Sequence, residues 1–286
     1  MAERWLVADV GGTNTRVALA DASGVQPGTV AALCTAVAGP VRGERAKLTN
    51  FDWMIDAADL RAATGANPVH LINDLQAQGH ALDDLPEGAV MPLFPGRPAP
   101  SEAPRLVLNL GTGCNVAAVH RVGGRLFVPA AESGHSDLPH ATGRTGALLD
   151  HLRSLQPHLP VEAALSGPGL ANIHAWISGT RRSPAEIVAD YEAGAAEAHE
   201  ALSLFARLLG TVAGGFALHH LPMGGLFLSG GTARAVAPHL AALDFLEAFV
   251  ARGPYTGIVR AIPVSLITDD SFALSGCARY LAQCLK

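Results

Sequence analysis

The sequence predicts a two-lobed α/β protein with a ligand cleft between its lobes, and three observations support this fold class. Strand-like runs meet at a glycine corner at residues 9–14 and again at 109–115, and α/β material follows each corner. Prolines at 86, 92, 95, 98, 100 and 104 mark a linker or exposed loop between the two halves. The length of 286 residues suits one large or two modest domains.

The composition indicates a compact globular chain, with 49% hydrophobic and 16% charged residues. The formal net charge is −5, and no Lys/Arg cluster exceeds a pair such as Arg181-Arg182. A nucleic-acid footprint and a basic membrane-binding face are therefore not expected. An anionic ligand would have to be held by backbone geometry and a metal ion.

The cysteines and the longest uncharged stretch indicate whether the chain is cytoplasmic, secreted or membrane-spanning. Four cysteines lie far apart, without a CxxC pair, which favours a reducing cytoplasm, and the N-terminus does not resemble a signal peptide. Residues 208–233 contain no Asp, Glu, Lys or Arg, which by length alone would suggest a membrane span. Because His219, His220 and Pro222 interrupt this stretch, we expect a buried helix followed by a buried strand instead.

Local patterns predict most of the elements. Residues 4–10 and 14–20 read as two strands, 33–39 and 68–74 as two more, and 56–64 as a helix that Gly65 caps. A second hairpin is expected from 105 to 128. Helices are expected to dominate beyond 144, interrupted by strands within 224–231 and 262–267, and the chain should end in a helix over 271–285.

The first glycine corner, D-V-G-G-T-N, has two interpretations. Its unobstructed backbone amides could hold phosphate, and Asp9 could hold a metal ion directly or through water. A simple two-residue hairpin turn is the alternative, and taken alone it is slightly favoured. Similar corners at Gly111-Thr112-Gly113 and Gly230-Gly231 shift the balance toward a polyanionic ligand. The spacing matches neither a dinucleotide fingerprint nor a P-loop.

Polar residues elsewhere suggest a hydroxyl-bearing substrate. Asp74, which follows an apolar strand, is either a helix cap or a general base with Asn73 fixing the substrate beside it. Glu132 and His135 share a short segment that lacks zinc-ligand spacing and suits a polyhydroxylated ligand better. Glu162 precedes a Ser-Gly-Pro-Gly turn that could equally be a loop between helices.

Together these segments resemble the bacterial glucokinases of the sugar kinase/actin/Hsp70 superfamily. The motifs occur in family order: DVGGTNTR, AVAGPV, LTNFDW, LINDL, GTG, ESGHSD, LSGPG and LFLSGG. The resemblance implies a ribonuclease-H-like fold with sugar and ATP bound in an interlobe cleft. Residues 1–106 would form the small lobe, with the helix 270–286 packing back onto it, and 107–269 the large lobe.

The resemblance also implies roles for individual residues. Asp74 would be the catalytic base, and ATP and Mg²⁺ would be required, with Asp9 near the metal. The sugar would be held by Asn50, Asn73, Glu132, His135 and Glu162. The nucleotide would be held by Asp9, Gly11, Gly12, Thr13, Asn14, Gly111, Thr112 and Gly113, with Gly230 and Gly231 near adenosine.

Two departures from the family pattern matter. GTG-Cys-Asn stands where bacterial members more often have GTG-Leu-Gly, and eukaryotic hexokinases place a sugar-contacting Asn there, so Asn115 is a further candidate sugar ligand. Between Asp21 and Leu33 an expected strand and helix are missing, so the N-terminal lobe is shortened. The strand 33–39 should still run parallel to the first strand. The exposed edge predicts either a homodimer contact or reduced stability.

The predicted function is therefore ATP-dependent phosphorylation of glucose to glucose 6-phosphate in the cytoplasm. A kinase of mannose, fructose or glucosamine and a catalytically weak sugar or nucleotide sensor are the alternatives. The expected partners are a small-molecule sugar, a nucleotide and a second copy of the chain. Zinc is not expected, because no cysteine lies near His135.

Overall fold

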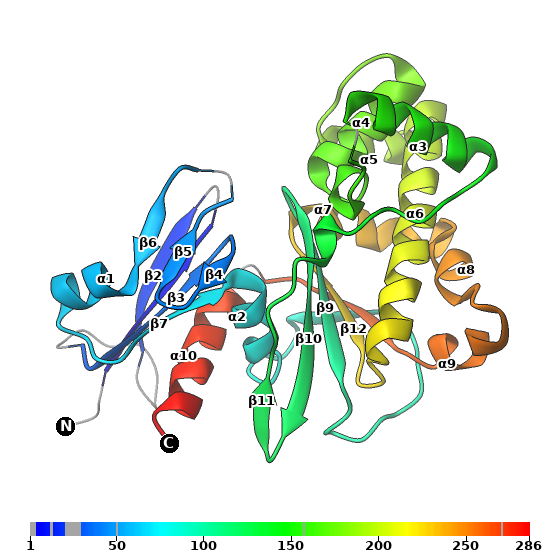
Figure 1. Ribbon diagram of the computed structural model, residues 1–286. Helices are drawn as coiled ribbons and strands as arrows, with labels where there is room; N and C mark the ends of the chain where they lie inside the picture. Colours follow the sequence, from blue (N-terminus) through cyan, green and yellow to red (C-terminus); the bar gives the residue numbers. More distant parts are fainter. Residues whose placement is uncertain (1–3, 12–13, 21–29, 50, 157, 270) are drawn as a thin grey trace. The chain divides into compact units, whose positions relative to one another are not determined.

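The computed structural model describes residues 4–11, 14–20, 30–49, 51–156, 158–269 and 271–286, which fall into two compact units. Unit 1 comprises Met1–Glu87, Arg121–Ala130 and Asp269–Lys286, and unit 2 comprises Gly88–His120 and Ala131–Thr268. Residues 88–106 thus belong to unit 2, because they carry a strand of its sheet. Figure 1 shows the elements of both units.

Unit 1 is built on a four-stranded sheet with the strand order β2-β1-β3-β7. These strands are β1 (Trp5–Val10), β2 (Thr15–Ala20), β3 (Ala32–Val37) and β7 (Val69–Asn73). The β1–β2 hairpin is antiparallel, whereas β3 runs parallel to both β1 and β7. The predicted parallel pairing is confirmed, and every residue of β3 is buried, as expected of a central parallel strand.

Two helices of unit 1 pack closely against each other beside this sheet (Figure 1). They are α2 (Asp74–Ala81) and α10 (Phe272–Cys284). Gly276 permits the contact, since a Cβ there would overlap the carbonyl oxygen of Ala77. The sheet core, with Trp5 and Ile72, is completed by Cys277 and Leu281 of α10. The C-terminal helix therefore supports the helix that begins at Asp74.

The rest of unit 1 consists of a small sheet, one helix and a hairpin tip. The small sheet has β4 (Val41–Arg42), β5 (Arg45–Lys47) and β6 (Met54–Asp56), and α1 (Ala57–Thr64) follows. As predicted, α1 ends at Gly65, which adopts a left-handed conformation with φ 72°. The hairpin tip, residues 121–130, receives a hydrogen bond from Gln76 of α2 to the Val128 carbonyl at 2.8 Å.

The second sheet has the strand order β11-β10-β9-β12-β13-β8. Its strands are β8 (Val90–Phe94), β9 (Arg105–Leu110), β10 (Cys114–Val122), β11 (Arg125–Phe127), β12 (Leu226–Ser229) and β13 (Val264–Ile267). The proline-rich segment was expected to be wholly a linker or loop, and this is wrong for Val90–Phe94. Because β8 is an edge strand, Pro92 is tolerated there although it has no N–H to donate.

Helices make up most of the remainder of unit 2. They are α3 (Gly143–Leu155), α4 (Gly167–Ser178), α5 (Pro184–Glu192), α6 (Ala196–His220), α7 (Gly231–Val236), α8 (Phe245–Val250) and α9 (Thr256–Arg260). Short 3-10 turns are η1 (Ser133–His135), η2 (Val161–Ala163), η3 (Ala237–Ala242) and η4 (Gly253–Tyr255). The uncharged stretch forms α6 and then β12, as predicted. Within the described ranges, α6 alone has the length and composition of a membrane-crossing helix, and 72% of that window is buried inside the protein.

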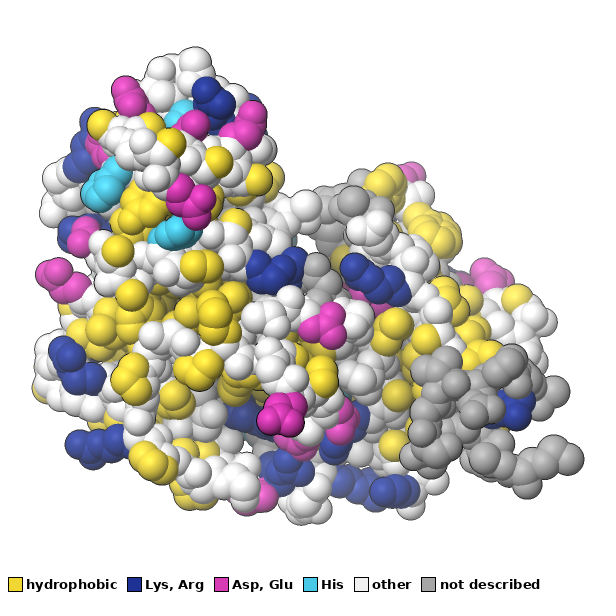
Figure 2. Space-filling view, turned by 180° about the vertical axis from the view of Figure 1, so that it is seen from behind, with side chains coloured by type: hydrophobic (Ala, Val, Ile, Leu, Met, Phe, Trp, Pro, Cys, Tyr) yellow, Lys and Arg dark blue, Asp and Glu magenta, His cyan; other side chains and the backbone are white. Residues whose placement is uncertain are grey.

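The charged side chains are interspersed on the face shown in Figure 2. Lys and Arg side chains lie among Asp and Glu side chains across both the upper and the lower parts of this face. The described part of this face therefore presents no broad basic field, which is consistent with the formal net charge of −5.

Candidate active site

The start of α2 is organised by Asn73, which is the N-cap residue of the helix. Its Oδ1 accepts the N–H of Leu75 at 2.9 Å, and its own N–H donates to Gln76 Oε1 at 3.0 Å, which completes a capping box. Its Nδ2 donates to the carbonyl of Gly39 at 3.2 Å. The buried Asn73 side chain thus fixes the helix start and ties it to the loop after β3.

Asp74 is the first residue of α2 rather than its cap. The N–H of Leu75 approaches Asp74 Oδ1 at 3.0 Å, and the residue is half-buried. The positive end of the helix dipole stabilises a carboxylate at this position. Because Asn73 is the N-cap of α2, the interpretation of Asp74 as the cap is wrong. A carboxylate at the first helical residue is compatible with a role in proton transfer.

The first glycine corner leaves the sheet at the same edge as Asp74. Val10 is aligned with Val37, and Val37 with Asn73, in three parallel strands, so all three strands end together. Ligands in open α/β sheets bind beyond this carboxyl edge. The N–H of Gly11 donates to the Asn14 carbonyl at 2.9 Å, which closes the corner.

Asp9 precedes this corner and is largely buried. The guanidinium of Arg16, its antiparallel neighbour in β2, lies 3.5 Å from Asp9 Oδ2. A single strand-end carboxylate suits Mg²⁺, which keeps most of its water shell and binds through one or two carboxylates together with substrate phosphates. The predicted residues Gly12, Thr13 and Asn50 lie outside the described residues.

Three glycine-containing segments of unit 2 converge on Gly111. Its N–H donates to the Gly113 carbonyl at 2.9 Å, which folds the GTG loop on itself. Its carbonyl accepts the N–H of Gly167 at 2.8 Å and the Thr232 hydroxyl at 3.2 Å. The start of α4 and the start of α7 are thereby joined to the GTG loop.

The second predicted glycine pair lies at the start of α7. Gly230 has φ 93°, and a Cβ there would meet Leu110 O at 2.5 Å, so this position requires glycine. Gly231 then begins the helix. The strand end, the glycine turn and the helix start occur in the predicted order, close to the GTG loop.

The predicted sugar-binding residues of unit 2 form one polar cluster. His135 Nδ1 lies 3.7 Å from Glu162 Oε1, and the other Glu162 oxygen accepts the Cys114 N–H at 3.4 Å. Asn115 Nδ2 donates to Glu132 Oε2 at 3.1 Å. Burial raises the pKa of Glu132, with a further rise from Glu162 and an opposing effect from His135. The cluster offers hydrogen-bond acceptors suited to hydroxyl groups.

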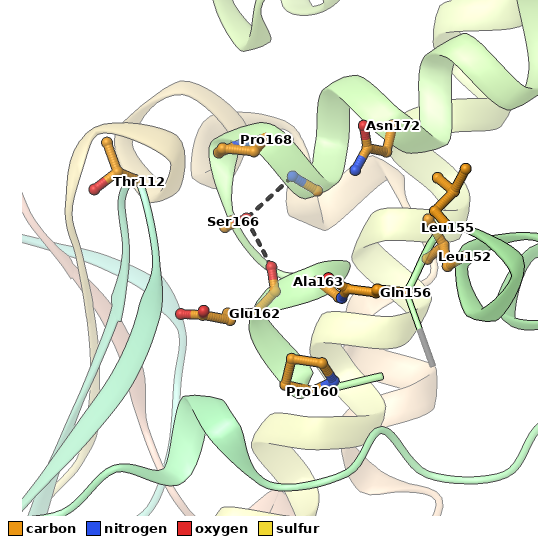
Figure 3. Close-up of a pocket in the computed structure, with 11 residues that line it drawn as sticks. Thr112, Leu152, Leu155, Gln156, Pro160, Glu162, Ala163, Ser166, Pro168 and Asn172 are labelled. Carbon is orange, nitrogen blue, oxygen red and sulfur yellow. Dashed lines mark hydrogen bonds between the residues drawn. The ribbon is translucent and has the colours of Figure 1, made fainter. Parts of the chain in front are cut away.

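A pocket of about 230 Å³ lies beside this cluster, shown in Figure 3. Thr112 and Glu162 line one side, and Leu152, Leu155 and Gln156 the opposite side. Ser166 lies between them, accepting the Gly169 N–H at 3.0 Å and donating to the Glu162 carbonyl at 2.7 Å. The pocket thus links the GTG loop, Glu162 and the first turn of α4.

Three residues that organise the site did not emerge from the sequence. Ser166 caps α4, and a Ser followed by Gly-Pro is a helix-start signal, although the same residues also suit a loop between helices. Gly39 and Thr232 hold distant backbone groups, and no local pattern reveals such contacts.

An α/β fold with glycine corners at strand ends, a carboxylate at a helix start and a polar cluster rich in hydrogen-bond acceptors is consistent with the class of sugar kinases. Solved structures support this class. The structure matches a glucokinase from an Antarctic psychrotroph with a TM-score of 0.85 and 27% identity, covering 99% of this chain and 100% of the other. It matches the fold of a Balamuthia mandrillaris glucokinase in complex with glucose (TM-score 0.83, 21% identity, covering 99% and 94%).

Residues 25–284 match the Glucokinase family. Glucokinases from Brucella suis and Agrobacterium fabrum are 35% and 33% identical to the chain over 270 residues, which cover 92% of this chain and 78% of each relative. The chain belongs to the glucokinase family and is an ATP-dependent sugar kinase.

Proposed function

We propose that this chain transfers the γ-phosphoryl group of ATP to O6 of glucose, with Asp74 as the general base. Family membership supports the reaction class. The position of Asp74 carries the residue assignment, because it places a carboxylate at the first residue of α2, directly after β7 and at the sheet edge where β1 and the first glycine corner also end.

In the proposed mechanism, Asp74 orients the attacking hydroxyl and accepts its proton as the new O–P bond forms. Phosphoryl transfer passes through a loose transition state, so alignment and charge neutralisation provide most of the catalysis. Asn73 positions the base, since its hydrogen bonds to Leu75 and Gly39 fix the first turn of α2. It would contact the sugar through its remaining hydrogen-bonding capacity.

The sugar is proposed to bind to the polar cluster of unit 2. Glu132 and Glu162 accept hydrogen bonds from sugar hydroxyls, and His135 contributes a ring nitrogen beside Glu162. A carboxylate can accept several hydroxyl protons at once, which favours a polyhydroxylated ligand over a less substituted alcohol.

The phosphates are proposed to bind to backbone amides of the two glycine corners, after Asp9 and at Thr112 and Gly113. The N–H groups of Gly11 and Gly111 instead close the corners themselves, by donating to the carbonyls of Asn14 and Gly113. The second corner is held in shape by Gly167 and Thr232, which supports its role as a preorganised phosphate loop. Gly230 and Gly231 would lie near adenosine. Asp9 would hold Mg²⁺ through its water shell, and the ion would neutralise phosphate charge.

Several broader features belong to the same proposal. The fold would be two-lobed, with an interlobe cleft, and unit 1 with the C-terminal helix would be the small lobe and unit 2 the large lobe. The protein would act in the cytoplasm as a homodimer. The outer strand β2 is the proposed contact, since it lies at the end of its sheet and carries Val17 at 60% exposure.

The function is tested by following ADP formation with ATP-Mg²⁺ and glucose, in the wild type and in Asp74→Asn. The substitution should lower kcat by roughly 10²-fold or more, the usual size of a general-base contribution. Asp59→Asn, in the first turn of α1 and exposed, is the matched control and should retain wild-type turnover.

Near-normal turnover by Asp74→Asn would refute the base assignment. A panel of glucose, mannose, fructose and glucosamine tests the substrate, and a higher kcat/KM for another hexose would replace glucose. Glucose binding by calorimetry without any ADP formation would instead indicate a sensor.

A further inference from the structure

The side-chain amide of Asn115 is fully occupied by contacts within the protein. Asn115 is the second residue of β10, two positions beyond the GTG loop. Its Nδ2 donates to Ala131 O at 2.7 Å and to Glu132 Oε2 at 3.1 Å. Its Oδ1 accepts the N–H of Ser133 at 2.9 Å and the N–H of Val116 at 2.8 Å. An amide offers two donors and two acceptor lone pairs, so all its capacity is used.

The Asn115 contacts attach the segment 131–135 to the start of β10. Gly134 reinforces the attachment, since its backbone lies so close to the Cys114 carbonyl that a Cβ would overlap the oxygen. Glu132 is the charged group in this segment, and a hydrogen bond to an ionised carboxylate is stronger than one between neutral groups. Asn115 therefore restricts the orientation of the Glu132 carboxylate.

We propose that Asn115 is a positioning residue that sets glucose affinity through Glu132, rather than a direct sugar ligand. The inference rests on the proposed function, in which Glu132 accepts hydrogen bonds from the sugar. Because Asn115 lies two residues beyond the GTG loop, the start of β10 carries the side chain that holds the Glu132 carboxylate and directly follows the amides proposed to bind phosphate. A carboxylate held in advance loses less rotamer freedom when glucose binds.

The first test is Asn115→Asp, which keeps an acceptor for Ser133 and Val116 but replaces the donor that faces Glu132. Glucose affinity, measured by calorimetry without ATP, should fall by about 10-fold or more, in line with a lost hydrogen bond to a charged group. The KM for ATP should change much less. Asn67→Asp, the same substitution at an exposed residue, is the control and should leave both constants unchanged.

The second test separates positioning from direct contact. Asn115→Ala is combined with Glu132→Gln, and glucose binding is measured for both single variants and the double variant. If Asn115 acts through Glu132, its replacement has little further effect once the carboxylate is gone, so the two effects are not additive. Additive losses of affinity would overturn the proposal in favour of direct contact between Asn115 and glucose.

The third readout is the pH dependence of glucose binding. A carboxylate introduced beside Glu132 raises the pKa of Glu132 further, whereas His135 opposes this rise and Glu162 adds to it. Glucose affinity is expected to fall at acidic pH as Glu132 becomes protonated, and this acid limb should move to higher pH in Asn115→Asp. An unchanged acid limb, or equal losses of glucose and ATP affinity, would indicate a merely structural role and overturn the proposal.

Asn115→Gly keeps the proposal testable if Asn115→Asp does not fold. It removes the amide without adding charge and should also weaken glucose binding more than ATP binding. Failure of both variants to fold would assign Asn115 to stability alone. Absence of ADP formation by the wild type would refute the kinase function separately, since the binding tests need no turnover.

Discussion

The backbone N–H of Gly167 donates to the carbonyl oxygen of Gly111 at 2.8 Å. This bond joins the first residue of α4 to the GTG loop, and the Thr232 hydroxyl reaches the same carbonyl at 3.2 Å from α7. Because both lone pairs of the Gly111 carbonyl are engaged, the loop is fixed from two sides. A loop fixed in this way can present its amides to phosphate without reorganising.

The pH dependence of glucose binding should follow the ionisation of Glu132. Partial burial raises the pKa of Glu132 above its usual value; His135 opposes this rise, and Glu162 adds to it. The carboxylate accepts hydroxyl protons only when it is deprotonated, so glucose affinity should fall as the pH falls through this raised pKa. Glu132→Gln should weaken binding at neutral pH and remove that acid limb. Calorimetric titrations across the acidic range provide the measurement, and an identical acid limb in the variant would contradict the assignment.

Gly134→Ala should weaken glucose binding by displacing the segment that carries Glu132 and His135. A Cβ at Gly134 would overlap the Cys114 carbonyl, and a backbone oxygen cannot move aside as a flexible side chain can. The expected costs are about 1–3 kcal/mol of folding stability and a roughly 10-fold rise in the glucose KM. Gly257→Ala, where a Cβ meets no atom within 4 Å, is the control. Unchanged glucose kinetics in Gly134→Ala would show that the segment tolerates displacement.

The sequence predicted the local elements well because their signals are local. Gly65 ends α1 in the expected left-handed conformation, and the uncharged stretch separates into a buried helix and a buried strand at its His and Pro residues. The strand β8 was not predicted, because the prolines of this segment indicate a loop. An edge strand tolerates a proline such as Pro92, but the sequence does not reveal that β8 is an edge strand. Asn and Asp are both favoured at the N-cap, so the sequence alone does not determine whether Asn73 or Asp74 caps α2. The structure assigns the cap to Asn73.

The site was harder to predict than the fold because its geometry depends on distant partners. Sequence motifs indicated Glu132, His135 and Glu162, and unit 2 brings these residues into one cluster. The hydrogen bonds of the Asn115 amide were not predicted. Ala131 and Ser133 contribute only backbone groups to them, and any residue type could supply those groups.

His80 should make the protein less stable as the pH falls from neutral toward 4. Burial, together with the charge of Arg279, lowers the pKa of His80 to about 4, whereas an unfolded histidine titrates near 6.5. Between these values the unfolded chain binds a proton that the folded chain does not, so stability is lost as the pH falls through this window. The resulting decrease in the free energy of unfolding is on the order of 3 kcal/mol once the pH is below both pKa values.

His80→Gln should reduce this loss, because glutamine does not titrate. Urea unfolding at pH 7 and pH 4.5 measures the difference in the free energy of unfolding for each variant. His140→Gln, at an exposed site, is the control and should keep the wild-type pH dependence. Equal losses in the wild type and His80→Gln would show that other groups govern acid sensitivity.

Two adjacent glycines of α6 should respond oppositely to the same substitution. A Cβ at Gly214 would overlap the Phe249 carbonyl and the Arg252 guanidinium, whereas a Cβ at Gly215 meets nothing within 4 Å. Gly214→Ala should therefore destabilise the protein by about 1–3 kcal/mol, because α6 must move away from α8. Gly215→Ala should stabilise it by roughly 0.5–1 kcal/mol through its higher helix propensity. Thermal unfolding of both variants measures the contrast, and a loss of stability in Gly215→Ala equal to that in Gly214→Ala would contradict the close packing of Gly214 against Phe249 and Arg252.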